Sequence, residues 1–277
     1  MPVPEDQRWA GLDVDRPNAA RMYDYSLGGS HNFPADRAAF EALLKVLPDA
    51  ALVGQANRAF LRRAVRYCVA QDVCQFLDIG SGIATVGNVH ESAHRLDPAC
   101  RVVYVDNDPV AVGTTRHVLA DQPNTAIVHA DLRDVDAVLA APEAAKLLDL
   151  GRPMALLMVA VLHYVPIEDD VLGIVGRYKA ALAPGSLFAV SHTTWDPRPE
   201  VAAAVRRVFD ESGLVVAHRS REEVAALFGG MELIGPGVVW TPEWHPTDDS
   251  GPLHDFPGRS ATYAAVGRVP GIRAVPG

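Results

Sequence analysis

Acidic residues stand at the ends of three successive apolar segments of this 277-residue chain. Asp78 ends the segment QFLD, Asp106 ends VVYVD, and Asp131 follows AIVHA. Directly after the first comes a turn, Gly80-Ser81-Gly82, whose missing glycine side chains let a ligand approach the backbone. One glycine turn is a weak signal, but three acids at successive segment ends indicate a site for a nucleoside-type ligand.

Two of these segment ends have specific tasks in binding a nucleoside. An acidic residue about 20 residues after a glycine turn can bind both ribose hydroxyls, and Asp106 fits this spacing, with Asn107 beside it. The Ala130 backbone and the Asp131 carboxylate are placed to bind the exocyclic amine and the ring edge of a base. A further segment, MALLMVAVLHY, should border the same ligand through Ala160.

The glycine turn and Asp78 bear on which nucleoside binds. A dinucleotide site needs G-x-G-x-x-G or A so that a pyrophosphate reaches a helix N-terminus, and the third position here is Thr85. The Asp78 carboxylate would also repel a pyrophosphate, whereas it favours a ligand that carries an ammonium group and a sulfonium cation. S-adenosylmethionine is such a ligand, and a nicotinamide-dependent oxidoreductase is the alternative.

The elements that position these residues are short apolar strands that alternate with helices from Cys74 onward. Strands that are apolar almost throughout and separated by helices predict a parallel sheet covered on both faces. Right-handed crossovers then give a doubly wound, mostly parallel α/β sheet. The predicted strands are QFLDIG, RVVYVDND, TAIVHADL, MALLMVAVLHY and SLFAVSHTT, with two more at 231–234 and 262–268, and helices begin near residues 87, 109, 134, 167, 199 and 221.

Ahead of the first strand the sequence predicts a helical lid or cap over residues 1–73, followed by one Rossmann-like unit over residues 74–277. Residues 1–16 read as a poorly ordered lead-in, and helices are expected from an Asn18 cap to residue 27, at 34–47 and at 50–70. On the third helix Arg58, Arg62 and Arg66 recur at i, i+4 spacing, which we interpret as a solvated face.

The stretch RMYDYSLGGSHNFPADR within this region is polar and aromatic. We expect it to wall the ligand site, with Tyr23, Tyr25, Gly29 and Asn32 as contacts. Gly28 and Gly29 are either a hinge for a closing lid or only the C-cap of a helix that covers the sheet.

Composition limits the partners and the compartment. The net charge is −9, so neither nucleic acid nor an anionic membrane is an expected partner. Three cysteines without a CxxC pair predict neither a disulfide framework nor structural zinc, and we expect no metal. The N-terminus lacks a basic and apolar leader and no run approaches ~18 apolar residues, so we expect a cytoplasmic protein.

Several segments together resemble a bacterial family of S-adenosylmethionine-dependent methyltransferases with the class I fold. They are YDYSLGGSHNFPADR, ANRAFLRRAVRY, FLDIGSGIATVGNVHE, VVYVDNDPV, VHADLRD and VAVLHYVP, and the likeness runs from about residue 16 to 268. The resemblance implies strand order 3-2-1-4-5-7-6 with an antiparallel seventh strand. It also implies that Asp78, Gly80, Ser81 and Gly82 surround the cofactor's amino-acid portion, that Asp106 holds the ribose, and that Asp131 and Leu132 frame the adenine.

The fourth strand carries Leu162-His163-Tyr164, and no D/N-P-P-Y motif follows it, which disfavours methylation of an adenine or glutamine amino group. A base histidine occurs in a similar segment of some small-molecule O-methyltransferases, so we expect O-methylation of a small molecule with His163 as base and Tyr164 beside the acceptor. His163 could instead only pack near the cofactor, and His192 is a second candidate. A non-catalytic cofactor-binding sensor is an alternative function, and a homodimer is one open arrangement.

Overall fold

A computed structural model of the chain describes residues 13–84, 87–196, 198–247 and 251–271. At its centre lies one sheet with the strand order β3-β2-β1-β4-β5-β8-β6. Five strands are parallel: β1 (Gln75–Ile79), β2 (Arg101–Asp106), β3 (Thr125–His129), β4 (Ala155–Val159) and β5 (Leu187–Thr193). Antiparallel to β5 runs β8 (Thr262–Arg268), which also pairs with the two-residue strands β6 (Glu232–Leu233) and β7 (Val239–Trp240).

The predicted doubly wound order is confirmed, with β8 in the place of the seventh strand. Two details differ. The strand β7, which pairs with β8, adds an eighth, short strand to the sheet. The fourth strand ends at Val159 rather than at Tyr164. It ends there because Ala160 adopts a positive φ of 57°, after which residues Leu162–Tyr164 form a 3-10 turn, η1.

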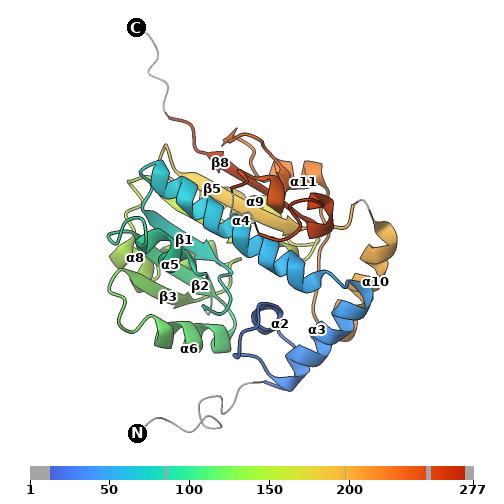
Figure 1. The fold of residues 1–277 in the computed structure, drawn as a ribbon. Helices are drawn as coiled ribbons and strands as arrows, with labels where there is room; N and C mark the ends of the chain where they lie inside the picture. The colour runs from blue at the N-terminus through green and yellow to red at the C-terminus, as the bar shows by residue number, and fades with distance from the viewer. Residues whose placement is uncertain (1–12, 85–86, 197, 248–250, 272–277) are drawn as a thin grey trace, which may run out of the picture.

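Helices cover both faces of the sheet (Figure 1). On one face α4 (Ala50–Ala70), α5 (Val89–His94) and α6 (Pro109–Val118) share an apolar core with the strands. On the other face the core is shared with α7 (Val135–Leu139), α8 (Pro142–Leu147), α9 (Val171–Ala180) and α11 (Arg221–Ala226). The predicted capping box of the last helix is present, whereas α9 begins four residues later than expected, after its N-cap Asp170.

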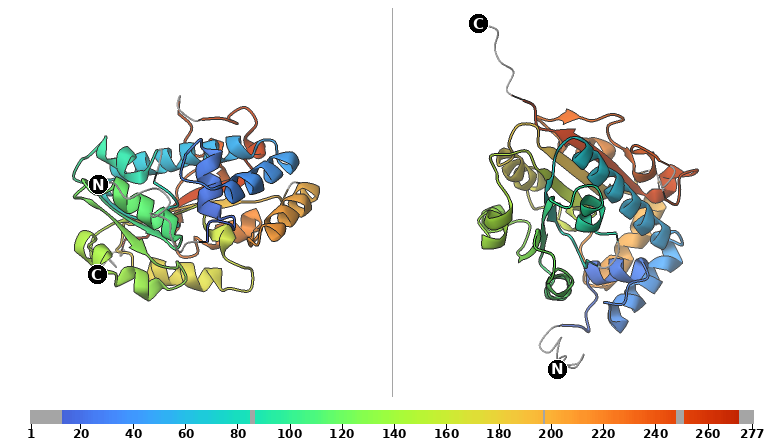
Figure 2. Two further views of the ribbon diagram at one scale, coloured as in Figure 1. Left: turned by 90° about the horizontal axis from the view of Figure 1, so that it is seen from below. Right: turned by 60° about the vertical axis from the view of Figure 1, so that its left-hand side comes forward.

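A third apolar cluster lies outside these two layers. It joins α2 (Ala19–Ser26), α3 (Pro34–Val46) and α10 (Pro199–Glu211), and Figures 1 and 2 show these three helices gathered at one end of the sheet. Asn18 caps α2 as predicted, because its side chain accepts hydrogen bonds from the N–H groups of Ala20 and Arg21. We call α2 and α3 together the helical cap.

The sequence predicted no disulfide framework, and the structure has one disulfide that was not expected. Cys74 and Cys100 are bonded to each other, and Cys68 is free and buried. The bonded residues directly precede β1 and β2, and the Arg101 N–H donates to the Cys74 carbonyl at 2.9 Å, so adjacent parallel strands bring the two Cα atoms within 4.5 Å. Their separation of 26 residues in sequence gives no such signal.

Candidate functional site

A cavity of about 470 Å³ lies at the carboxyl ends of the parallel strands. Strand order reverses between β1 and β4, which is where doubly wound sheets bind ligands. The helical cap, the first half of α4 and α10 close the cavity from the other side. All cofactor residues predicted from the sequence line it: Asp78, Gly80, Ser81, Gly82, Asp106, Asn107, Ala130, Asp131, Leu132 and Ala160.

The glycine turn after β1 is built for close approach. Gly80 has a φ of +68°, and a Cβ atom there would lie 2.1 Å from a methyl of Val161, so neither the conformation nor the space admits a side chain. Gly82 also has a positive φ and lies under Ala20 of α2. The cap therefore sits directly over the turn. Thr85, the departure from the dinucleotide pattern, lies outside the described residues.

Asp106 is fixed by the backbone of two loops. Its Oδ2 accepts a hydrogen bond from Gly82 N–H at 2.7 Å, and its Oδ1 accepts one from Asp108 N–H at 2.9 Å. Burial raises the pKa of this carboxyl group despite these hydrogen bonds. Each oxygen keeps a further lone pair, which is what two ribose hydroxyls would need.

Asp78 is buried at the end of β1 and faces an arginine that sequence analysis assigned to solvent. Burial, with the negative charge of Asp106, raises the pKa of Asp78 to about 7, although Arg58 opposes this shift. Arg58 is only 9% exposed, lines the cavity, and lies over the Tyr23 ring at 5.2 Å. Its Nε is buried without a hydrogen-bond partner. The interpretation of the arginine row as a solvated face is thus wrong for Arg58, because α4 turns this position under the cap.

Asp131 lies at the rim of the cavity and is held by an arginine that sequence analysis missed. The Arg133 guanidinium donates to both Asp131 oxygens, at 2.7 to 3.2 Å, and also reaches Asp169. These hydrogen bonds lower the pKa of Asp131, so this carboxylate stays ionised. Arg133 follows Asp131 by two residues, and this spacing was the only sign in the sequence that the two could pair. Both side chains line the cavity.

A chain of hydrogen bonds ties the strand ends to the cap. The Ala160 N–H donates to Ser191 Oγ at 2.9 Å, and that hydroxyl donates to Asn57 Oδ1 at 2.6 Å. Asn57 Nδ2 then donates to the Tyr23 hydroxyl, which donates to the Gly54 carbonyl. The network fixes the strained turn after β4 against α4 and α2, and Asn57 was not predicted as part of the site.

His163 lies on η1 beside Tyr164, and both residues line the cavity. The two rings are 4.2 Å apart. Burial, reinforced by nearby His192, His218 and Arg219, lowers the pKa of His163 well below the usual range, so the imidazole is neutral at neutral pH. Arg219 also fixes η1, since it donates to the carbonyls of Leu162 and Val165.

Four residues predicted to contact the acceptor or form the lid do not line the cavity in the structure. His192 Nε2 faces Arg219 at 3.1 Å and its Nδ1 faces the Thr193 carbonyl, so both ring nitrogens are engaged. The other three have positions within the cap. Tyr25 packs on Phe40, Asn32 donates a hydrogen bond to Asp24, and a side chain on Gly29 would collide with Asp24. Of the four residues predicted in this stretch, only Tyr23 lines the cavity.

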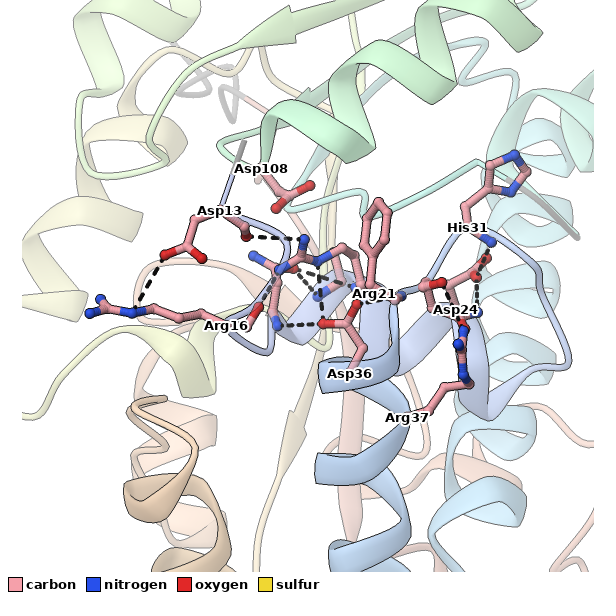
Figure 3. Close-up of polar contacts among 12 residues, drawn as sticks. Asp13, Arg16, Arg21, Asp24, His31, Asp36, Arg37 and Asp108 are labelled. Atoms are coloured by element: carbon pink, nitrogen blue, oxygen red, sulfur yellow. Dashed lines mark hydrogen bonds and ion pairs between the residues drawn. The ribbon is translucent and has the colours of Figure 1, made fainter. Parts of the chain in front are cut away.

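An ion pair buried between α2 and α3 holds the cap together (Figure 3). Arg21 Nε lies 3.3 Å from Asp36 Oδ1, with side chains 4% and 0% exposed. Asp36 also accepts the N–H groups of Asn18 and Phe33. This ion pair therefore joins the two ends of the polar stretch at residues 21–37.

The fold and this cavity define a class I methyltransferase that depends on S-adenosylmethionine. The chain belongs to the S-adenosyl methyltransferase family, whose sequence model matches residues 5–270. This assignment removes the nicotinamide alternative. No curated protein matches the chain.

Solved structures agree with the family. A DUF574-family protein from Streptomyces avermitilis is 38% identical, with a TM-score of 0.89 over 93% of this chain and 99% of that one. A presumed methyltransferase from Thermobifida fusca is also 38% identical, with a TM-score of 0.86 over 95% and 98% of the two chains. The plantazolicin methyltransferase, solved with S-adenosylhomocysteine, has a TM-score of 0.51 at 10% identity over 90% and 94%, which shows a shared fold.

None of the helices within the described ranges combines the length and apolar character required to cross a lipid bilayer.

Proposed function

We propose that the protein methylates a hydroxyl group of a small molecule, with His163 as the general base. The observation that carries this is the buried imidazole of His163 on η1, which lines the cavity and whose Nδ1 has no hydrogen-bond partner among the described residues. S-adenosylmethionine, when bound, supplies an electrophilic methyl group on a sulfonium centre.

The residues at the charged end fit that cofactor. Asp78 would bind the ammonium group, which returns its carboxyl group to the ionised form, and Asp106 would hold the ribose hydroxyls. Ala130, Asp131 and Leu132 would border the adenine. The glycine turn supports this placement because Gly80 and Gly82 line the cavity together with Asp78 and Asp106.

Arg58 would bind the carboxylate of the cofactor's methionine portion. A buried guanidinium is unfavourable unless its donors are paired, and the Nε of Arg58 is buried without a hydrogen-bond partner. Arg58 interacts electrostatically with Asp78 and both line the cavity, so this end offers one positive and one negative group. A zwitterionic amino-acid end complements that pair.

His163 would accept the proton of the acceptor hydroxyl as its oxygen forms the new bond to the methyl carbon. The imidazole is unprotonated before the reaction, and Tyr164 beside it limits where the hydroxyl can lie.

The test is transfer of a labelled methyl group from S-adenosylmethionine to an acceptor, with His163→Gln compared with wild type. General-base catalysis typically contributes 10²- to 10⁴-fold, so we expect turnover to fall by at least about 100-fold. The affinity for S-adenosylhomocysteine, measured by calorimetry, should stay within about twofold. His117→Gln, on the exposed face of α6, is the matched control. Full turnover in His163→Gln would reject this role.

A further inference from the structure

The part of the cavity beyond η1 has a different character from the cofactor end. We call it the apolar lobe, and define it by six lining residues that belong to α3, to α10 or to the chain directly after α3 and shortly before α10. They are Phe40, Leu43, Leu47, Trp195, Val205 and Phe209, all buried and all members of the cluster that joins the cap to α10.

Charge is divided sharply between the two ends. The charged side chains among the described lining residues are Arg58, Asp78, Asp106, Asp131 and Arg133. Four of them lie at or just after the ends of β1, β2 and β3, and Arg58 interacts electrostatically with Asp78. None belongs to the apolar lobe. Thr193 and Thr262 also line the cavity, and their hydroxyl groups are neutral. The two residues are register partners on the antiparallel strands β5 and β8.

The cavity that includes the lobe has the size of a ligand site rather than that of a packing defect. Protein interiors leave few voids larger than a water molecule, whereas small-molecule sites commonly measure about 300 to 1,000 Å³. The whole cavity is about 470 Å³, and the lobe residues, the cofactor end, His163 and Tyr164 all line it. The Tyr164 ring lies 6.5 Å from that of Phe209, so the polar junction leads directly onto an apolar wall.

We propose that the acceptor is an uncharged small molecule whose apolar body fills this lobe and whose single nucleophilic hydroxyl lies at His163. The proposal rests on the proposed function. An ionised group in the lobe would lose its hydration without a partner, whereas an apolar body gains from burial. In the reaction the acceptor oxygen bonds to the methyl carbon, the carbon–sulfur bond breaks with its electron pair left on sulfur, and the hydroxyl proton passes to His163.

Binding of two matched probes tests the acceptor class. The probes are 2-naphthol, which is neutral with one hydroxyl, and 6-hydroxynaphthalene-2-sulfonate, which adds one negative charge. Each is titrated into protein saturated with S-adenosylhomocysteine and followed by naphthol fluorescence. We expect 2-naphthol to bind at least about tenfold more tightly. Equal or tighter binding of the sulfonate, or no binding of 2-naphthol, would overturn the proposal.

Two wall variants then locate the probe. Val205→Thr is almost isosteric but places a hydroxyl on the lobe wall, and Phe209→Tyr does so on the neighbouring turn of α10. Each should weaken 2-naphthol binding by about fivefold or more and leave S-adenosylhomocysteine affinity unchanged, which also establishes that the variant is folded. Val118→Thr, exposed at the end of α6, is the control. Unchanged 2-naphthol affinity in both wall variants would place the probe elsewhere and reject the lobe.

The outcomes separate this inference from the proposed function. If 2-naphthol binds the lobe as expected but His163→Gln retains full methyl transfer, the base role fails and the acceptor class stands. If methyl transfer proceeds through His163 but only charged acceptors bind, the acceptor class fails alone.

Discussion

At the scale of single residues, the site keeps a carboxyl group where water cannot stabilise its charge. Asp78 is fully enclosed at the end of β1, and its pKa of about 7 lies far above the ordinary value of 3.8. The folded protein therefore holds a proton on Asp78 between about pH 4 and 7 that the unfolded chain has released. By linkage, this residue makes the ligand-free protein less stable as pH rises through that window, and the destabilisation is complete above pH 7.

Asp78→Asn should reverse this effect and impair cofactor binding. We expect the free energy of unfolding at pH 8, from urea titration, to rise by about 2 to 4 kcal/mol, because the buried charge is gone. Wild-type affinity for S-adenosylhomocysteine should increase about tenfold from pH 6 to pH 8, since its ammonium group favours the ionised carboxylate. The variant should bind weakly and without that pH dependence. A wild-type affinity that is flat over this range would contradict the role of Asp78.

Strand ends allowed the acids to be predicted from sequence, but not the arginines around them. Asp78, Asp106 and Asp131 each end an apolar run, and the sheet brings such ends to one edge. Arg58 belongs to a charge row on a helix, a pattern that usually faces water. Only the packing of α2 over α4 buries it, and that tertiary contact has no local signal.

At the scale of elements, polar contacts that need no ligand hold the cap in place. The Arg21–Asp36 pair joins α2 to α3, and Tyr23 joins α2 to α4 through Asn57. We therefore favour a cover over a hinged lid, although Gly28 has the positive φ that either role uses. The helix bounds were largely predictable from caps and prolines. The end of β4 was not, because the apolar run continues through η1 and only the φ of Ala160 breaks it.

Asp36→Ala should loosen the cap. It leaves the Arg21 guanidinium buried without its carboxylate, and removal of one partner of a buried ion pair typically costs about 3 to 5 kcal/mol. Urea unfolding should detect this loss. The exposed pair of Arg177 and Asp136 supplies the control, and Asp136→Ala should change stability by less than about 1 kcal/mol. Equal effects of the two substitutions would show that the buried pair does not hold the cap.

At the scale of the whole molecule, the division into a helical region 1–73 and a sheet region 74–277 remains a prediction. The packing of α4 indicates that the two regions fold together. Phe60, Leu61 and Ala64 of that helix share the core of the sheet with Phe76 of β1. The first half of the same helix lines the cavity under the cap. One helix thus belongs to both regions.

Unfolding should accordingly occur in a single transition. Trp195 lies in the cluster that joins the cap to α10, and Trp244 lies in the core of the sheet. Two variants that each keep only one of these residues, with the other three of the four tryptophans changed to Phe, report on the two regions separately. Tryptophan fluorescence and far-ultraviolet circular dichroism should give coincident urea midpoints in both variants. Midpoints that separate by region would indicate two independently folding units.

The packing of α3 against α10 also has a consequence during synthesis of the chain. Phe40 and Leu43 leave the ribosome well before Val205 and Phe209, the residues that cover them. At ordinary elongation rates of about 5 to 20 residues per second, this delay is on the order of 10 s, far longer than helix formation itself. During that interval the part of the apolar face of α3 that packs against α10 has no native cover. The surface that we propose to receive an apolar molecule in the finished protein is thus, in the nascent chain, an exposed apolar surface that chaperones could shield.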